Sequence, residues 1–186
     1  MLFTADRSVL VVVDVQPYFV GKLPDDVGTT LVQRVAWLAA VAVALDVPVV
    51  VTEEEPGRNG ATVDAVRERL PGVTAHTKPT FGLANTPSIL DAVTRTGRDR
   101  VVLCGLETDV CVAQSAIGLA DLGWPVGVVR DACGAPGEAH DQGLERMAAE
   151  GVRLVGLKGL YYEWIRSVDR LGLAGLPADR PVGIVM

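Results

Sequence analysis

Histidine and cysteine are both scarce in this sequence, and their scarcity excludes several classes of site. The chain has two histidines, His76 and His140, which lie far apart in the sequence and leave little material for a metal site. Its three cysteines are an odd number at wide spacing. A disulfide framework needs paired cysteines, so reduced thiols are expected, and these are typical of a cytoplasmic protein. We therefore predict a cytoplasmic protein without a metal centre.

Basic clusters and long apolar runs are also missing. The net charge is −6 and no block of lysine or arginine occurs, which argues against a nucleic-acid partner. No run at the start combines a basic stretch, an apolar stretch and a cleavage site, and apolar stretches such as 36–45 are too short to span a bilayer. No GxGxxG run is present, so a dinucleotide cofactor is not expected. We predict no membrane, nucleic-acid or cofactor partner.

Apolar residues are plentiful, at 49% of 186 residues with a mean hydropathy of +0.31, which indicates a well-packed chain of one domain over 1–186. Short β-branched runs alternate with longer helical patterns. This alternation predicts an α/β fold of three layers, α/β/α and Rossmann-like, around a six-stranded parallel sheet in the order 3-2-1-4-5-6. The expected strands are 8–16, 47–53, 73–76, 99–106, 124–132 and 152–157. The expected helices are 29–46 (capped by Thr29 or Thr30), 62–70, 85–97, 109–123, 137–151 and one from about Leu160.

Three polar residues stand at the ends of predicted strands: Asp14 after the first, Lys78 after the third and Cys111 after the fourth. In the predicted order, strands one and four are neighbours, so Asp14 and Cys111 would face each other at the edge where ligands bind. A helix N-terminus and the Lys78 cation would both lower the pKa of the Cys111 thiol. Taken singly, they are more often a turn-forming aspartate, a solvated lysine and a core cysteine. Their shared placement at three strand ends makes a catalytic role as good an explanation as these structural ones.

The segments "VLVVVDVQPYF", "TKPTFGL" and "VVLCGLETDVCVAQSAIGLADLGWPVGVVRDACGA" resemble the isochorismatase-like cysteine hydrolase superfamily. The likeness runs from about Ser8 to Leu157. That family includes nicotinamidases, N-carbamoylsarcosine amidohydrolases and isochorismatases. The resemblance implies an Asp–Lys–Cys triad on Asp14, Lys78 and Cys111, and a cis peptide bond between Leu106 and Glu107.

The function expected from this resemblance is the cofactor-free hydrolysis of a small amide, or of a related ester or carbamoyl group. Asp14 would accept the thiol proton, Lys78 would stabilise the thiolate, and the thiolate would attack the carbonyl. The remaining expected site residues are the backbone amides of Glu107 and Cys111 for the oxyanion, and Phe19, Phe81, Gln16 and Thr108 for the substrate. Two alternatives stay open: a vinyl-ether hydrolase that uses Asp14 as proton donor, and a catalytically silent scaffold on the same fold.

The segment after strand two reads "TEEEPGRNGATVDAV" and has no histidine, whereas metal-dependent nicotinamidases have an aspartate and histidines there. Glu53, Glu54, Glu55 and Asp64 are oxygen ligands at best, and we interpret them as a charged loop. No metal is therefore expected, and nicotinamide is a poor substrate candidate.

Cys104 and Cys133 are the other two thiols, and neither is expected to react. Cys104 lies within a buried strand, and Cys133 lies in a loop where its pKa should stay near the ordinary value of about 8.5. The apolar first helix around Trp37 predicts a homo-oligomer. The resemblance implies the same, because members of the family are commonly oligomeric. The final segment 171–186 is expected to lie across a neighbouring subunit.

Overall fold

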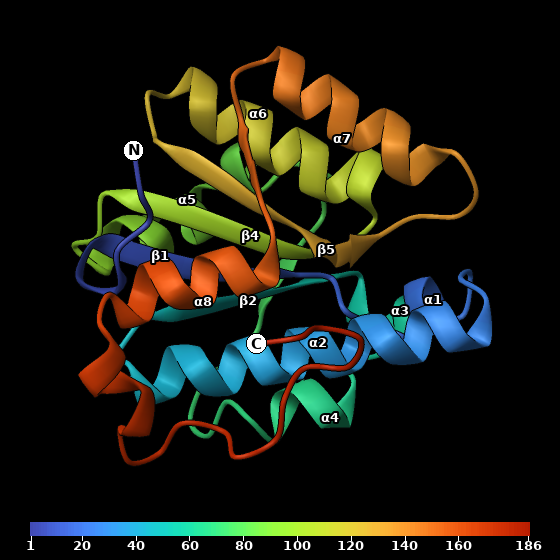
Figure 1. Cartoon of the computed structure of the whole chain (residues 1–186). Helices are drawn as coiled ribbons and strands as arrows, with labels where there is room; N and C mark the ends of the chain where they lie inside the picture. Colours follow the sequence, from blue (N-terminus) through green and yellow to red (C-terminus); the bar gives the residue numbers. More distant parts are fainter.

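A six-stranded parallel sheet forms the centre of the computed structural model, which describes all of residues 1–186 (Figure 1). The strand order is β3-β2-β1-β4-β5-β6, which confirms the predicted order. The strands are β1 (Ser8–Val13), β2 (Val49–Glu54), β3 (His76–Lys78), β4 (Arg100–Leu106), β5 (Val126–Gly134) and β6 (Arg153–Val155).

Helices cover both faces of the sheet, which confirms the three predicted layers. The helices α2, α4 and α8 lie on one side, and α5, α6 and α7 lie on the other (Figure 1). The elements are η1 (Ala5–Arg7), α1 (Pro17–Val20), α2 (Asp25–Ala44), α3 (Pro56–Asn59), α4 (Asp64–Arg67), η2 (Leu83–Asn85), α5 (Pro87–Arg95), the π-helical turn η3 (Thr108–Val112), α6 (Ala113–Asp121), α7 (Ala139–Ala149), α8 (Leu157–Ile165) and η4 (Val168–Gly172).

The central strands are apolar throughout because both of their faces are covered. Every residue of β1 and of β4 is buried, as expected of parallel strands between two helical layers. In the pairing register, Val13 lies opposite Thr52 of β2 and Gly105 of β4. The carboxyl ends of β2, β1 and β4 therefore meet at one edge of the sheet.

Gly105 permits the close approach of β4 to β1 at that edge. Its φ is +123°, and a Cβ atom there would lie 2.0 Å from the carbonyl oxygen of Val13. Only glycine fits such a contact without moving the backbone. The chain after β4 thus begins beside the end of β1, which brings η3 next to Asp14.

Some predicted boundaries were wrong. The first long helix, α2, begins at Asp25 rather than at Thr29 or Thr30, and neither threonine caps it. The acidic residues Asp25 and Asp26 in its first turn suit the positive end of the helix dipole. The helix is long and apolar enough to cross a membrane by length and composition, and half of its most apolar window is buried inside the fold. The third strand, β3, lies later than predicted, so Lys78 is its last residue rather than one that follows it.

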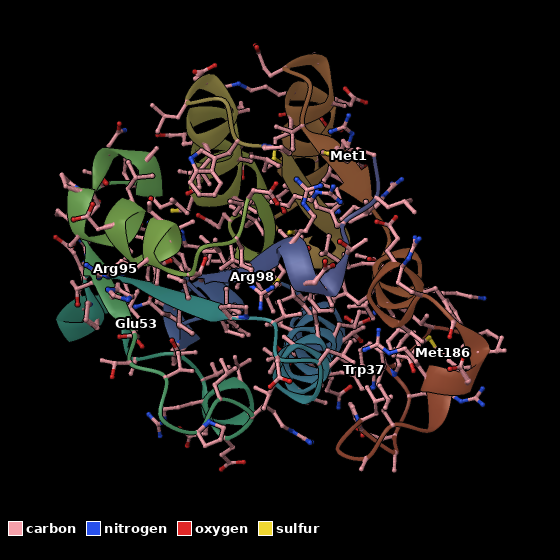
Figure 2. The ribbon with its side chains drawn as sticks, turned by 90° about the vertical axis from the view of Figure 1, so that its left-hand side faces the viewer. Met1, Trp37, Glu53, Arg95, Arg98 and Met186 are labelled. Atoms are coloured by element: carbon pink, nitrogen blue, oxygen red, sulfur yellow. The ribbon has the colours of Figure 1, made fainter.

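The C-terminal segment packs on its own chain, against α2. After α8, the chain returns along α2, where Figure 2 shows Trp37 beside this segment. Trp37 Nε1 donates to the carbonyl of Asp179 at 2.9 Å, and Arg34 Nε donates to that of Val182 at 3.0 Å. Trp37 is consequently only 6% exposed.

Candidate active site

Asp14 lies directly after β1, in the left-handed region with φ of +48°, a conformation that aspartate tolerates better than most residues. Its backbone N–H donates to Thr52 O at 3.1 Å, which keeps the chain in register with β2. Its Oδ1 accepts a hydrogen bond from Thr52 Oγ1 at 2.8 Å, and the residue is fully buried. Burial raises the pKa of Asp14 more than the nearby Lys78 lowers it.

Lys78 at the end of β3 joins Asp14 to Cys111. Its Nζ lies 2.6 Å from Asp14 Oδ2 and 3.4 Å from Cys111 Sγ, and it donates to Thr80 O at 3.0 Å. The Asp14 contact is a buried ion pair between the ammonium and the carboxylate. Burial opposes the charged form of Lys78, but Asp14 and Cys111 outweigh it, so its pKa is raised and the ammonium form persists.

Cys111 lies in η3, the turn that leads from β4 into α6, and only 2% of its surface is exposed. Burial and the carboxylates of Asp14 and Glu54 raise the pKa of the thiol well above its usual value, although Lys78 lowers it. The predicted lowering of this pKa is therefore wrong for the resting site. Because the charges are coupled, the thiol loses its proton only as a neighbouring carboxylate gains one.

Glu54 is the site residue that the sequence interpretation missed. It is the last residue of β2, and Cys111 Sγ donates to its Oε2 at 3.3 Å. Lys78 Nζ lies 3.8 Å from the same oxygen. The interpretation as a charged loop is wrong for this residue. Its position at the end of the strand beside β1 could have indicated that it belongs to the site.

The donor atoms of Asp14, Glu54 and Cys111 all lie within 4.8 Å of one another, a grouping that could hold a metal ion. The Lys78 ammonium, however, contacts both the Asp14 carboxylate and the thiol, and lies near Glu54. A divalent ion in this space would be repelled by the ammonium. The residues present fit a lysine cation better than a metal.

A cavity of about 180 Å³ opens over Cys111. Phe19 and Phe81 line it, in keeping with the predicted substrate role, and Lys22 forms an ion pair with Glu107 at 3.2 Å across its wall. The lining residues are Tyr18, Phe19, Lys22, Glu54, Arg58, Asn59, Phe81, Glu107, Val110 and Cys111. The peptide between Leu106 and Glu107 is cis, as the resemblance implies.

Gln16 and Thr108, the other two residues expected to bind substrate, do not line this cavity. Gln16 is fully buried, and its amide bridges the backbone of Glu54, donating to the carbonyl at 3.0 Å and accepting from the N–H at 2.8 Å. Thr108 Oγ1 lies 2.9 Å from His140 Nδ1 of α7. Gln16 therefore holds the backbone of Glu54, and Thr108 contacts α7 instead of the cavity.

Cys133 belongs to β5 rather than to a loop, which corrects its predicted environment. It is buried, and burial raises its pKa to about 12. It lines a larger cavity of about 590 Å³ between the start of α2 and the end of β5, which holds none of the three triad residues. We place the site at the smaller cavity because the Asp14–Lys78–Cys111 cluster adjoins it.

Residues 8–158 match the sequence model of the isochorismatase domain. The chain belongs to the isochorismatase family. Among curated members, it is 33% identical over 165 residues to the secreted isochorismatase effector Isc1 of Phytophthora sojae, covering 84% of this chain and 76% of that protein. It is also 33% identical over 166 residues to isochorismatase domain-containing protein 2 of Rattus norvegicus, covering 87% and 75%.

Solved structures of the isochorismatase family share this fold. YcaC from Pseudomonas aeruginosa, solved with hexane-2,5-diol and covalent acrylamide, is 26% identical and superposes with a TM-score of 0.84 over 94% of this chain and 88% of that one. YcaC from Escherichia coli, described as an octameric hydrolase of unknown specificity, is 24% identical with a TM-score of 0.84 over 95% and 87%. This second likeness shows the fold alone.

Proposed function

We propose that this isochorismatase-family hydrolase cleaves the C–N bond of a small amide through a thioester on Cys111. The observation that carries the proposal is the contact of one buried ammonium with both Asp14 and Cys111, next to a cavity lined by that cysteine. A nucleophile beside an acid–base group and a fixed cation is the arrangement that covalent acyl transfer requires.

The size and charge of the cavity favour a small, uncharged substrate. Its volume of about 180 Å³ is below the roughly 300–1,000 Å³ of pockets for drug-sized ligands. The acidic groups in and beneath it are Asp14, Glu54 and Glu107, and the basic groups are Lys22, Arg58 and Lys78. These charges balance, so the site suits a neutral amide better than an acid of isochorismate type, which carries two carboxylates.

In the first chemical step, the Cys111 proton passes to a neighbouring carboxylate while sulfur attacks the substrate carbonyl. The sequence predicts that this carboxylate is Asp14. The C–S bond forms as the C=O π bond becomes an oxyanion, which the backbone N–H groups of Glu107 and Cys111 would bind. Lys78 supplies the positive charge that stabilises the sulfur while it is anionic.

In the second step, the C–N bond breaks and the leaving nitrogen takes up the proton that the thiol released. The product of this step is a thioester on Cys111. Water then attacks the thioester and gives its proton to a carboxylate, and the C–S bond breaks to release the acid. The thiolate regains the proton, so the cycle consumes one water and needs no redox partner.

A structural relative bears a covalently attached small amide. The Pseudomonas YcaC structure holds covalent acrylamide, and the alkene of acrylamide alkylates thiols. A nucleophilic cysteine next to a pocket that admits a small amide would form such an adduct.

The test is ammonia release from a panel of small primary amides, ureas and carbamoyl compounds. We expect turnover of at least one compound, and its abolition by Cys111→Ala and Cys111→Ser. Cys133→Ala is the matched control, since Cys133 lies in the other cavity and should not affect turnover. A wild-type protein that hydrolyses none of the panel, with its Cys111 thiol intact, would contradict the proposal.

A further inference from the structure

The larger cavity, of about 590 Å³, is lined by none of the residues that the proposed reaction uses. It lies between the first turns of α2, the end of β5 and the start of α7, which meet at one end of the molecule (Figure 1). We propose that this cavity is a second binding site, for a small organic carboxylate with an apolar body. The proposal does not depend on amide hydrolysis, because no triad residue takes part in it.

The size and the lining of this cavity suit an organic molecule. Its volume lies within the roughly 300–1,000 Å³ of pockets that hold small ligands. Leu23, Val27 and Leu31, in and just before α2, supply apolar surface, and Thr30 supplies a hydroxyl. An aliphatic or aromatic body can therefore be buried against α2 while a polar group of the ligand meets the polar side chains.

Two arginines give the cavity its positive charge. Neither Arg34 nor Arg130 forms an ion pair with a carboxylate of the chain. Arg34 is held by neutral acceptors, since its Nε donates to the carbonyl of Val182 at 3.0 Å and its Nη1 to that of Asp131 at 3.0 Å. Arg130 is exposed on β5. A carboxylate is the natural counter-ion of an unpaired guanidinium, which can bind it through two parallel N–H···O bonds.

The acidic side chains of the wall do not pair with these arginines. The Asp131 side chain contacts α8 instead, because its Oδ1 accepts the backbone N–H of Leu157, the first residue of that helix, at 2.7 Å. Asp26 is exposed in the first turn of α2, where the positive end of the helix dipole opposes its charge. The cavity therefore favours an anion over a cation.

His140, at the start of α7, adds a neutral polar group to the wall. Its Nδ1 lies 2.9 Å from Thr108 Oγ1, which leaves Nε2 for hydrogen bonds outside that pair. Burial lowers the pKa of the imidazole and Arg130 lowers it further, although Asp141 acts in the opposite direction. At pH 7 the ring is neutral, so it offers a hydrogen bond and the arginines supply the charge.

This cavity is separate from the active site, although the two share a pair of strands. Cys133 and Gly134 of β5 line it, and they pair with Gly105 and Leu106 at the end of β4. Cys111 lies beyond that strand end, in η3, and lines only the smaller of the two cavities. A ligand of the larger cavity should therefore bind equally well whether or not Cys111 carries a covalent group.

The experiment measures binding of benzoate by isothermal titration calorimetry, with benzamide as an uncharged molecule of the same shape. Both are titrated into untreated protein and into protein whose Cys111 is alkylated with iodoacetamide, which blocks hydrolysis and fills the smaller cavity. We expect benzoate to bind both preparations with the same Kd within threefold. Benzamide should bind the alkylated protein at least about tenfold more weakly, since it cannot form charge-assisted hydrogen bonds.

Arg130→Gln tests the cation directly. Because Arg130 is exposed and unpaired, the variant should fold as the wild type does, and its Kd for benzoate should rise by about tenfold or more. Arg153→Gln is the matched control, since Arg153 is an exposed arginine on the neighbouring strand β6 and does not line the cavity. A crystal structure of the benzoate complex should place the carboxylate on Arg130.

Three results would overturn the proposal. The first is no binding of benzoate at millimolar concentration, as would occur if a second copy of the chain covered the cavity. The second is loss of binding after Cys111 alkylation, which would place the anion in the active site. The third is an unchanged Kd in Arg130→Gln. Failure of the protein to hydrolyse amides would contradict the proposed function and leave these measurements unaffected.

Discussion

Lys78 is the buried cation of the site, and its replacement by methionine isolates what that charge does. Methionine matches the length of the aliphatic part of lysine but carries no charge. The variant removes the contacts of 2.6 Å to Asp14 and 3.4 Å to Cys111 sulfur. We expect Lys78→Met to slow alkylation of Cys111 and to abolish hydrolysis.

The magnitude follows from the second distance. At 3.4 Å and an effective dielectric constant of about 20, two unit charges attract by about 5 kcal/mol. This would correspond to between roughly three and four units in the pKa of the thiol, at about 1.4 kcal/mol per unit. Without its cation, Asp14 takes up a proton and repels the thiolate less, which recovers part of the loss. A net decrease of about a hundredfold in alkylation rate at pH 7 is therefore expected, equivalent to about 2.7 kcal/mol.

The assay is the rate of carbamidomethylation of Cys111 by iodoacetamide, followed by peptide mapping between pH 6 and pH 9. Lys22→Met is the matched control, since Lys22 lines the cavity but pairs with Glu107 rather than with the thiol. An alkylation rate within threefold of wild type, in a folded Lys78→Met protein, would refute the role of the ammonium.

Stability needs a separate check, because removal of one partner of a buried ion pair costs about 3–5 kcal/mol. The double variant Asp14→Asn with Lys78→Met leaves no unpaired charge, and we expect it to regain much of that loss in urea unfolding. If the double variant folds well and still alkylates slowly, the effect on Cys111 belongs to the missing cation and not to unfolding.

Four further predictions concern the thiols, the oligomeric state and the C-terminal segment. Brief treatment with iodoacetamide at pH 7 should label Cys111 before Cys104 and Cys133, because Lys78 lies beside Cys111 alone; mapping that finds mainly Cys133 would contradict this. The free energy of unfolding should fall above about pH 9, because thiols of the unfolded chain ionise there while burial raises the pKa of Cys133 in the folded chain to about 12. Between these two pKa values the loss for that thiol is up to about 4 kcal/mol. Cys133→Ala should reduce this loss, measured by urea unfolding at pH 8 and pH 10.5. Light scattering at micromolar concentration should show an oligomer, and a clean monomer would contradict this. Deletion of residues 174–186 should expose Trp37, shift its fluorescence to the red and lower the melting temperature. An unchanged spectrum would contradict the contact between Trp37 and this segment.

The layered fold follows from the sequence pattern. Runs such as 8–13 and 100–106 are apolar on both faces, and only a parallel strand between two helical layers buries both. Strand ends in such a sheet gather at one edge, and this rule alone predicted that Asp14 and Cys111 would meet. Helix α2 began earlier than predicted because its first turn is set by Pro24 and two acidic residues and not by a threonine cap.

The electrostatics of the site depend on contacts between distant parts of the chain. The spacing of Cys111 after a strand indicates a helix start and a lowered pKa. The pKa is instead raised, because burial, Asp14 and Glu54 outweigh Lys78, and these three residues come from three other places in the chain. The same holds for Glu54, whose sequence neighbours are two more glutamates. Glu53 turns to Thr62 and Glu55 to solvent, whereas Glu54 reaches the thiol. Local periodicity assigns a residue to a strand or helix, but the partners of its side chain depend on contacts between distant segments.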